Sequence, residues 1–234
     1  MIEAEWWDYD DADEFATAVA GDVAFIIESA IDARGSAVIA LAGGKTPMPV
    51  LEKLAEAKLN WKKVTILPTD DRIVALDNPL SNVAMLAKIF LPKGARVVPI
   101  ISASVKDYKL AGTAASSRIS DFHWPLDLVW LGMGEDGHTA SIFNGPDLED
   151  ALTALPEQKA VGVMPDPMPA DAPVARVTLT KASIQAAKSI VVVLTGAKKR
   201  ALLEAAIEAG DASPLPIGRV LAGLETPIDI HWHA

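Results

Sequence analysis

A histidine in the middle of the chain stands where acid–base chemistry is expected. His138 follows an apolar run, residues 126–131, and a glycine-rich segment, residues 132–137, in which glycine allows backbone conformations closed to other residues. An imidazole serves as a general base at neutral pH, and ligands of open parallel sheets bind at the carboxyl ends of strands. Asp136 lies close enough in sequence either to orient the imidazole or to cap the turn. The pattern favours a catalytic His138 over a hydrogen-bonded structural histidine.

A second glycine-bearing turn follows the apolar run at residues 37–42. It consists of Gly43, Gly44, Lys45 and Thr46. Backbone amides of such a turn at a helix N-terminus favour an anion. The P-loop of nucleotide-binding proteins would need a glycine where Ile39 stands, and Pro47 removes an amide, so we expect an anion site without that motif.

Three positive side chains lie beside other predicted strand ends. Arg72 closes the segment 70–72, Arg176 begins an apolar run, and Lys199 follows a third turn, residues 195–196. A surface ion pair is the plain interpretation of segment 70–72. The functional interpretation is that Arg72 binds a phosphate or carboxylate while Asp70 or its neighbour binds a sugar hydroxyl.

Two further patterns suggest a dinucleotide site and a metal site, but neither pattern is complete. Residues 132–137 spell G-x-G-x-x-G, but Pro146 stops the long helix that a dinucleotide site requires. His231 and His233 share one face of a terminal apolar run, but two imidazoles fall short of the three or four ligands that a metal site needs. No metal is therefore expected.

Apolar runs alternate with helical patterns along the chain, which is typical of a parallel sheet covered by helices on both faces. Strands are predicted at residues 37–42, 64–67, 96–101, 126–131, 176–179, 190–194 and 228–232. Helices are predicted at 13–34, from Thr46 and Pro47, from Asn78 and Pro79, at 107–121, at 181–187 and after residue 196. Residues 139–141 are expected to form one helical turn, and the proline-rich residues 145–174 a long ordered loop. The fold class is α/β, a doubly wound, mostly parallel, Rossmann-like sheet, expected to form one domain over residues 1–234.

Composition narrows the class of partner. The 234 residues are 50% hydrophobic and include no cysteine, so a large core is available and thiolate metal sites are excluded. No apolar run approaches the roughly 20 residues that cross a bilayer, and the acidic start is unlike a signal peptide. We therefore expect a cytoplasmic protein with no membrane partner. The net charge of −10 disfavours nucleic acid, and an anionic ligand would need positive charge gathered at its site.

Together these segments resemble the 6-phosphogluconolactonase family, within the glucosamine/galactosamine-6-phosphate isomerase superfamily. The matches follow the family's order over nearly the whole chain, and the most specific is the Gly-His-Thr-Ala-Ser segment at 137–141. The others are residues 41–47, 70–72, 81–82, 131–136, 176–179 and 195–199.

The resemblance implies hydrolysis of 6-phosphoglucono-δ-lactone, a step of the oxidative pentose phosphate pathway, without metal or organic cofactor. Water activated by His138 can attack the lactone carbonyl directly, and the oxyanion would need donors from residues 132–137 or from Arg72. The candidate residues are His138 and Asp136 for catalysis, and Gly43, Gly44, Lys45, Thr46, Asp70, Arg72, Gly134, Arg176 and Lys199 for substrate binding. Two positions depart from the family: Lys45 stands where serine is usual, and Asp71 where glutamate is usual.

Two alternatives stay open. A glucosamine-6-phosphate deaminase or isomerase has a similar Asp-Gly-His turn, but there the histidine is followed by Ile-Ala-Phe-Asn-Glu-Pro with a catalytic glutamate, whereas residues 139–146 read TASIFNGP. A non-catalytic sugar-phosphate sensor is the second, although residues 1–36 contain no basic recognition helix. The sequence is compatible with a monomer or a small homo-oligomer.

Overall fold

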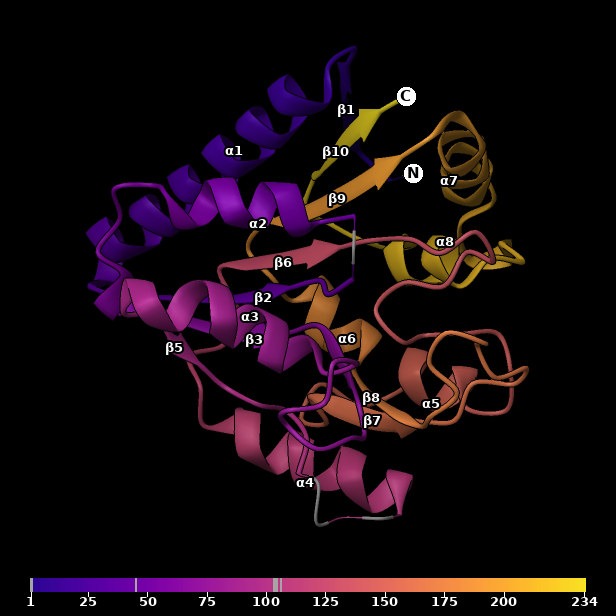
Figure 1. Ribbon diagram of the computed structural model, residues 1–234. Helices are drawn as coiled ribbons and strands as arrows, with labels where there is room; N and C mark the ends of the chain where they lie inside the picture. Colours follow the sequence, from indigo (N-terminus) through magenta and orange to yellow (C-terminus); the bar gives the residue numbers. More distant parts are fainter. Residues whose placement is uncertain (1, 45, 103–104, 106) are drawn as a thin grey trace.

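The structure is a computed structural model, and it describes residues 2–44, 46–102, 105 and 107–234. Its centre is a seven-stranded sheet in the order β1-β10-β9-β6-β2-β3-β5, in which every neighbouring pair is parallel (Figure 1). The strands are β1 (Ala4–Tyr9), β2 (Ala37–Leu41), β3 (Val64–Pro68), β5 (Arg96–Val97), β6 (Leu128–Leu131), β9 (Ile190–Thr195) and β10 (Ile228–His233). The predicted α/β class and parallel sheet are confirmed.

Helices cover both faces of this sheet. The first face carries α1 (Ala12–Arg34), α2 (Met48–Ala55) and α3 (Asn82–Phe90). The hydrophobic core on the second face contains residues of α6 (Lys181–Gln185), α7 (Ala197–Ala209) and α8 (Pro216–Leu221), and it continues to α4 (Tyr108–Ser120) and α5 (Leu148–Leu152). Short 3₁₀ turns occupy Trp61–Lys63, Leu91–Lys93 and Gly210–Ala212.

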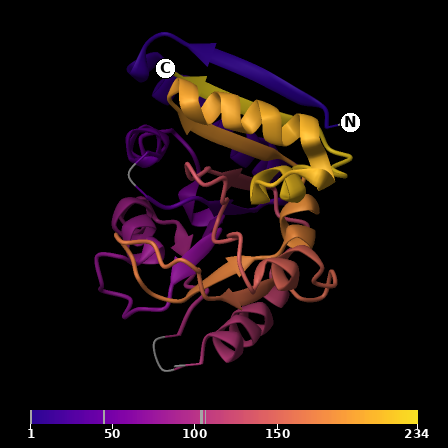
Figure 2. The same cartoon turned by 90° about the vertical axis from the view of Figure 1, so that its right-hand side faces the viewer.

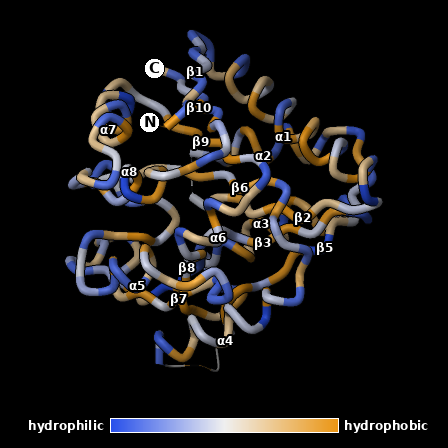
Figure 3. The backbone as a smooth tube through the Cα atoms, turned by 180° about the vertical axis from the view of Figure 1, so that it is seen from behind, coloured by the Kyte–Doolittle hydropathy of each residue, from blue (hydrophilic) through white to orange (hydrophobic). Residues whose placement is uncertain are grey.

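The two hydrophobic cores follow from the two-residue repeat of the strands. In β6, Leu128 and Trp130 pack into the core under α1–α3, whereas Val129 and Leu131 pack into the core on the opposite face. Successive residues of β9 alternate between the cores in the same way. Figure 3 shows hydrophobic residues running along these central strands. A strand buried on both faces therefore reads as a continuous apolar run, which is why these strands were predictable.

A second, antiparallel sheet stands beside the first. It has the order β4-β8-β7, from β4 (Asp70–Arg72), β8 (Arg176–Leu179) and β7 (Ala160–Val163). One residue, Thr69, joins β3 to β4. Its N–H donates to the carbonyl of Leu41 in the large sheet, and its carbonyl accepts from the N–H of Leu179 in the small one. The two sheets are therefore linked through the backbone of a single buried threonine.

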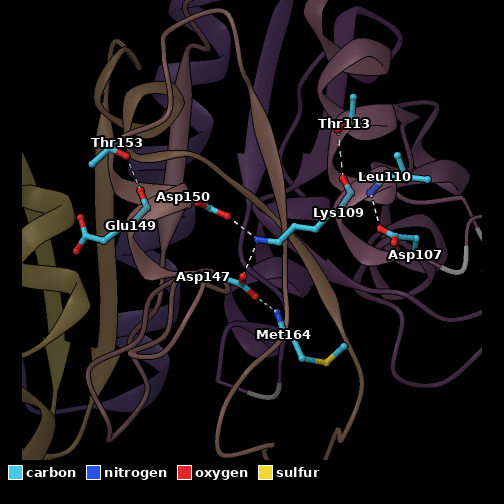
Figure 4. A network of polar contacts seen from close by, with 9 residues as sticks. All are labelled: Asp107, Lys109, Leu110, Thr113, Asp147, Glu149, Asp150, Thr153 and Met164. Atoms are coloured by element: carbon cyan, nitrogen blue, oxygen red, sulfur yellow. Dashed lines mark hydrogen bonds and ion pairs between the residues drawn. The ribbon is translucent and has the colours of Figure 1, made fainter.

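Helix α4 covers the small sheet at unusually short range. A Cβ added to Gly112 would lie 1.9 Å from the backbone nitrogen of Gly162 in β7, so neither position has room for a side chain. Lys109 then ties α4 to α5, because its Nζ donates to both Asp147 and Asp150 at 2.5 Å (Figure 4). Asp147 also accepts the N–H of Met164 at 2.7 Å. These contacts order the segment that the sequence presented as a loop.

Several predicted elements need correction. Residues 145–174 are not one long loop, because they contain α5 and β7. The strand at 176–179 exists but belongs to the antiparallel sheet. The strand expected at 96–101 is limited to β5, although the N–H of Val98 still donates to the carbonyl of Ile66 in β3. Residues 139–141 form no helical turn; Thr139 instead bridges Ile142, and Ala140 between them has a positive φ of 49°.

Two helix starts also differ, and two strands were not anticipated. Thr46 does not cap α2, which begins at Met48 after Pro47 without a side-chain cap. Helix α3 begins at Asn82, capped by Ser81, rather than at residues 78–79. Strand β4 follows the strand predicted at 64–67 but belongs to the second sheet, and β1 at the acidic start pairs with β10 along the sheet edge, beside each other in Figure 2. Among the described residues no helix is long and apolar enough to cross a membrane.

Candidate active site

A cavity of about 310 Å³ opens at the carboxyl ends of the central strands. It lies where chain order reverses in the sheet: β3 and β5 follow β2 on one side, whereas β6, β9 and β10 lie on the other. Such a reversal leaves a crevice between the loops that follow adjacent strands. The residues lining it come from turns after β2, β3, β6 and β9 and from the small sheet: Ala42, Gly43, Gly44, Thr46, Pro47, Thr69, Asp70, Arg72, Asn82, Trp130, Gly132, Met133, Gly134, His138, Ala140, Asp171, Arg176, Val193 and Lys199.

His138 reaches this cavity with its ring oriented by Asp136. The imidazole Nδ1 lies 2.5 Å from Oδ1 of Asp136, which also accepts the N–H of His138 at 3.2 Å. Asp136 thus both orients the imidazole and closes the turn. The hydrogen bond from His138 lowers the pKa of Asp136, so the carboxylate is ionised and can only accept. Nδ1 therefore carries the proton, and Nε2 holds the lone pair of a potential base.

Gly134 makes room for that ring. A Cβ at this position would lie 2.3 Å from Cε1 and Nδ1 of His138. The glycine is thus needed for close approach of backbone and imidazole. The N–H of Gly134 donates to the carbonyl of His138, and the N–H of Gly137 to that of Gly134, so both amides are used inside the turn.

Two arginines face each other across the small sheet. Arg72 on β4 and Arg176 on β8 are register partners, and directly opposed residues in an antiparallel pair project from the same face. Both Nε atoms are buried without a hydrogen-bond partner in the part of the chain that the structure describes. Burial lowers the pKa of Arg176; the negative charge of Asp70 opposes this shift, and the positive charge of Arg72 adds to it. Like charges held together this way are destabilising unless an anion lies between them.

Asn82, at the start of α3, connects three parts of the site. Its Oδ1 accepts from Nη1 of Arg72, and its Nδ2 donates to the carbonyl of Asp70 at 2.7 Å. A Cβ on Gly43 would lie only 2.0 Å from the same Oδ1. The amide therefore fixes the guanidinium and abuts the first glycine turn at once.

Two buried aspartates support this arrangement. Asp70 lines the cavity and accepts from Oγ of Ser141 at 2.5 Å. Asp71 is turned away, where it accepts from the N–H groups of Arg72, Asn82 and Val83. Its carboxylate does not bind the Arg72 guanidinium, so its departure from the family pattern bears on the start of α3 instead. Burial raises the pKa of Asp71 to about 6.

The structure thus gathers most of the residues expected from the sequence. The cavity is lined by Gly43, Gly44, Thr46, Asp70, Arg72, Gly134, His138, Arg176 and Lys199, and Asp136 stands directly behind His138. Lys45 lies outside the described residues. Asn82, Thr69 and Asp171 also line the cavity, although the sequence did not single them out as site residues. Only Asn82 had a local signal, its place within a matched family segment.

Comparison with known proteins agrees with this geometry. The family model described as Glucosamine-6-phosphate isomerases/6-phosphogluconolactonase matches residues 10–231. The 6-phosphogluconolactonase of Rhizobium meliloti (strain 1021) is 35% identical over 228 residues, 96% of each chain. That of Pseudomonas putida is 33% identical over 225 residues, 95% of this chain and 90% of the other. A 6-phosphogluconolactonase structure from Shewanella baltica OS155 has a TM-score of 0.90 at 31% identity and covers 99% of this chain and 98% of that one. The resemblance inferred from the sequence is confirmed, and the chain belongs to the glucosamine-6-phosphate isomerase/6-phosphogluconolactonase family.

Proposed function

We propose that this protein hydrolyses 6-phospho-D-glucono-1,5-lactone to 6-phospho-D-gluconate, with His138 activating the attacking water. The relatives that carry this name match nearly the whole chain. The observation that carries the residue assignment is the cavity itself, which is lined by an oriented imidazole and by two arginines whose buried Nε atoms have no hydrogen-bond partner among the described residues.

In this mechanism the phosphate binds between Arg72 and Arg176. A dianion there would relieve the repulsion between the two guanidinium groups and pair their buried Nε atoms. Lys199, in the first turn of α7, and the turn after β2 border the same cavity and add positive potential. This local charge would offset the net charge of −10, which repels an anionic substrate at long range.

With the phosphate held, the lactone carbonyl is presented to His138. Nε2 takes a proton from water as the water oxygen attacks the carbonyl carbon. The tetrahedral intermediate then collapses, the ring C–O bond breaks, and the imidazolium returns its proton to the departing ring oxygen, which becomes the free hydroxyl group of the product. Asp136 stabilises the imidazolium formed in the first step. Because the amides of Gly134 and Gly137 already donate within the turn, we assign the developing oxyanion to a cationic side chain of the cavity.

We also propose that residues 1–234 form a single domain. We further propose that the enzyme works in the cytoplasm, since a chain without cysteine suits a reducing compartment. The absence of a nucleic-acid partner stays a prediction from the net charge.

The test is a pH-stat assay with freshly generated lactone, corrected for spontaneous hydrolysis. His138→Ala should lower kcat by about 100-fold or more, the usual contribution of a general base, while binding of 6-phosphogluconate is retained. His123→Ala, at an exposed histidine away from the cavity, is the matched control and should keep full activity. Ammonia release from glucosamine 6-phosphate without lactone hydrolysis would replace this proposal by the deaminase, and binding without any turnover would replace it by a sensor.

A further inference from the structure

Phe143 stands behind the site, in contact with two of its key side chains. Its ring stacks on the imidazole of His138, with the centroids 4.2 Å apart and the planes at 28°. The guanidinium carbon of Arg176 lies 5.2 Å from the centre of the same phenyl ring. His138 and Arg176 line the cavity, whereas Phe143 is not among the described residues that do so. Any effect of Phe143 on substrate must therefore pass through these two neighbours.

The imidazole needs more than Asp136 to hold its orientation. The Asp136 side chain is 61% exposed, so its hydrogen bond to Nδ1 competes with water. One hydrogen bond also leaves the ring free to rock about the line that joins Nδ1 to the carboxylate. A phenyl ring stacked on the imidazole restricts that motion, because tilting the imidazole would lose the face-to-face contact.

The buried charge of Arg176 also needs a neighbouring group that stabilises it. Its side chain is buried, its Nε has no partner, and its Nη2 donates to the carbonyl of Ala172 at 3.2 Å. Among the described residues it forms no ion pair with a carboxylate within 4.0 Å. The face of an aromatic ring attracts a cation, and more strongly where water is excluded. Phe143 thus supplies a contact that stabilises this charge before any anion arrives.

We propose that Phe143 is a positioning residue, which fixes the His138 imidazole and the Arg176 guanidinium relative to each other so that water activation and phosphate binding act on one substrate. The inference rests on the proposed lactonase function. It assigns a role to a side chain that does not itself reach the substrate. Its loss should therefore change kcat through His138 and KM through Arg176 together.

The experiment compares Phe143→Leu with Phe143→Tyr. Leucine keeps an apolar side chain but removes the aromatic face, so we expect kcat to fall about three- to tenfold and KM to rise by a similar factor, the scale of one stacking and one cation–π contact. Tyrosine retains the ring and should restore both constants to within about twofold of the wild-type values, since its face carries the same contacts. Inorganic phosphate should also bind less tightly to the leucine variant.

Phe122 provides the matched control. It is half-buried and carries the guanidinium of Arg96 at 5.4 Å from its ring centre, but it is remote from the cavity. Phe122→Leu removes an equivalent contact, so it should lower the melting temperature without changing kcat or KM. Changes in kinetics that appear equally in both leucine variants would overturn the positioning role, as would unchanged kinetics in Phe143→Leu.

Two measurements separate this inference from the proposed function. NMR of the His138 ring protons reports ring-current shifts from Phe143, which the leucine variant should abolish whether or not lactone is the substrate. If the wild-type enzyme fails to hydrolyse lactone, the proposed function falls; if the His138 signals do not move, the contact itself is refuted. Should Phe143→Leu not fold, Phe143→Met gives the same comparison with an unbranched side chain.

Discussion

Gly43→Ala is expected to disable the site through a collision that the structure locates. An alanine Cβ at this position would lie 2.0 Å from Oδ1, 2.2 Å from Cγ and 2.6 Å from Nδ2 of Asn82. Gly43 has no left-handed backbone conformation, so the substitution adds no strain of its own. The only way to accommodate the methyl group is to displace the Asn82 amide.

The size of the effect follows from the hydrogen bonds that this displacement breaks. Asn82 would lose its contact with Arg72, which involves a charged group, and its 2.7 Å bond to the carbonyl of Asp70. Hydrogen bonds contribute about 0.5–1.5 kcal/mol each, and about 1.5–3 when one partner is charged. We therefore expect Gly43→Ala to lower the free energy of unfolding by about 2–4 kcal/mol and kcat/KM by at least about tenfold, because Arg72 is no longer held.

A double-mutant cycle tests the cause. In the background of Asn82→Ala the obstructing amide is absent, so adding Gly43→Ala should change the unfolding free energy by less than about 0.5 kcal/mol. Gly44→Ala is the control. Its position has a φ of 103° and nothing within 4 Å of an added Cβ, so its penalty is backbone strain of about 1–2 kcal/mol and should be the same with or without Asn82.

Unfolding in urea gives the free energy of unfolding, and steady-state kinetics give kcat/KM. Both are measured for the wild type, the single variants and the double variants. If Gly43→Ala and Asn82→Ala are additive, the collision is not the cause and the reasoning is wrong. Equal coupling of Gly44→Ala with Asn82→Ala would point to a general loosening of the turn instead.

Two further predictions concern Asp71 and Gly134. Because the pKa of Asp71 rises from 3.8 to about 6 on folding, the folded state binds the proton more tightly, and this contribution to stability is complete at low pH and is lost as pH rises through 6. The unfolding free energy of the wild type relative to Asp71→Asn should therefore decrease by about 2 kcal/mol between pH 4 and pH 7 in urea titrations, and a difference independent of pH would contradict the assignment. Gly134→Ala should displace the imidazole and lower kcat by about 10-fold or more with KM less affected, since the atoms nearest to the added Cβ belong to His138 and Asp136. A variant with wild-type kcat would show that the ring tolerates displacement.

The large sheet was predictable because its strands are buried on both faces. The runs at 37–41, 128–131 and 190–195 contain almost no polar residue, and the glycines after two of them mark the turns that form the site. Strand β1 gave a weaker signal, because this edge strand consists of half-buried and exposed residues, two of them acidic, and has no continuous apolar run. Strand β4, with the sequence Asp-Asp-Arg, has no apolar pattern at all and exists through its pairing with β8.

The site could be predicted only as separate parts. Strand ends identified His138, Arg72 and Lys199 one by one, since sheet topology brings such ends together. The opposition of Arg72 and Arg176 could not be foreseen, because it depends on an antiparallel register between segments about a hundred residues apart. Phe143 was equally hidden, since a lone phenylalanine after a turn looks like any other packing residue.

The link through Thr69 divides the site between two frameworks. His138 follows a strand of the large sheet, whereas the small sheet carries both arginines, and Thr69 joins the two sheets at the step from β3 to β4. Under the proposed mechanism, recognition of the phosphate and activation of water therefore depend on different sheets. Substitutions within β4 or β8 can therefore change which anionic group is accepted while the base stays in place, a route by which relatives with this architecture could diverge in substrate without rebuilding their chemistry.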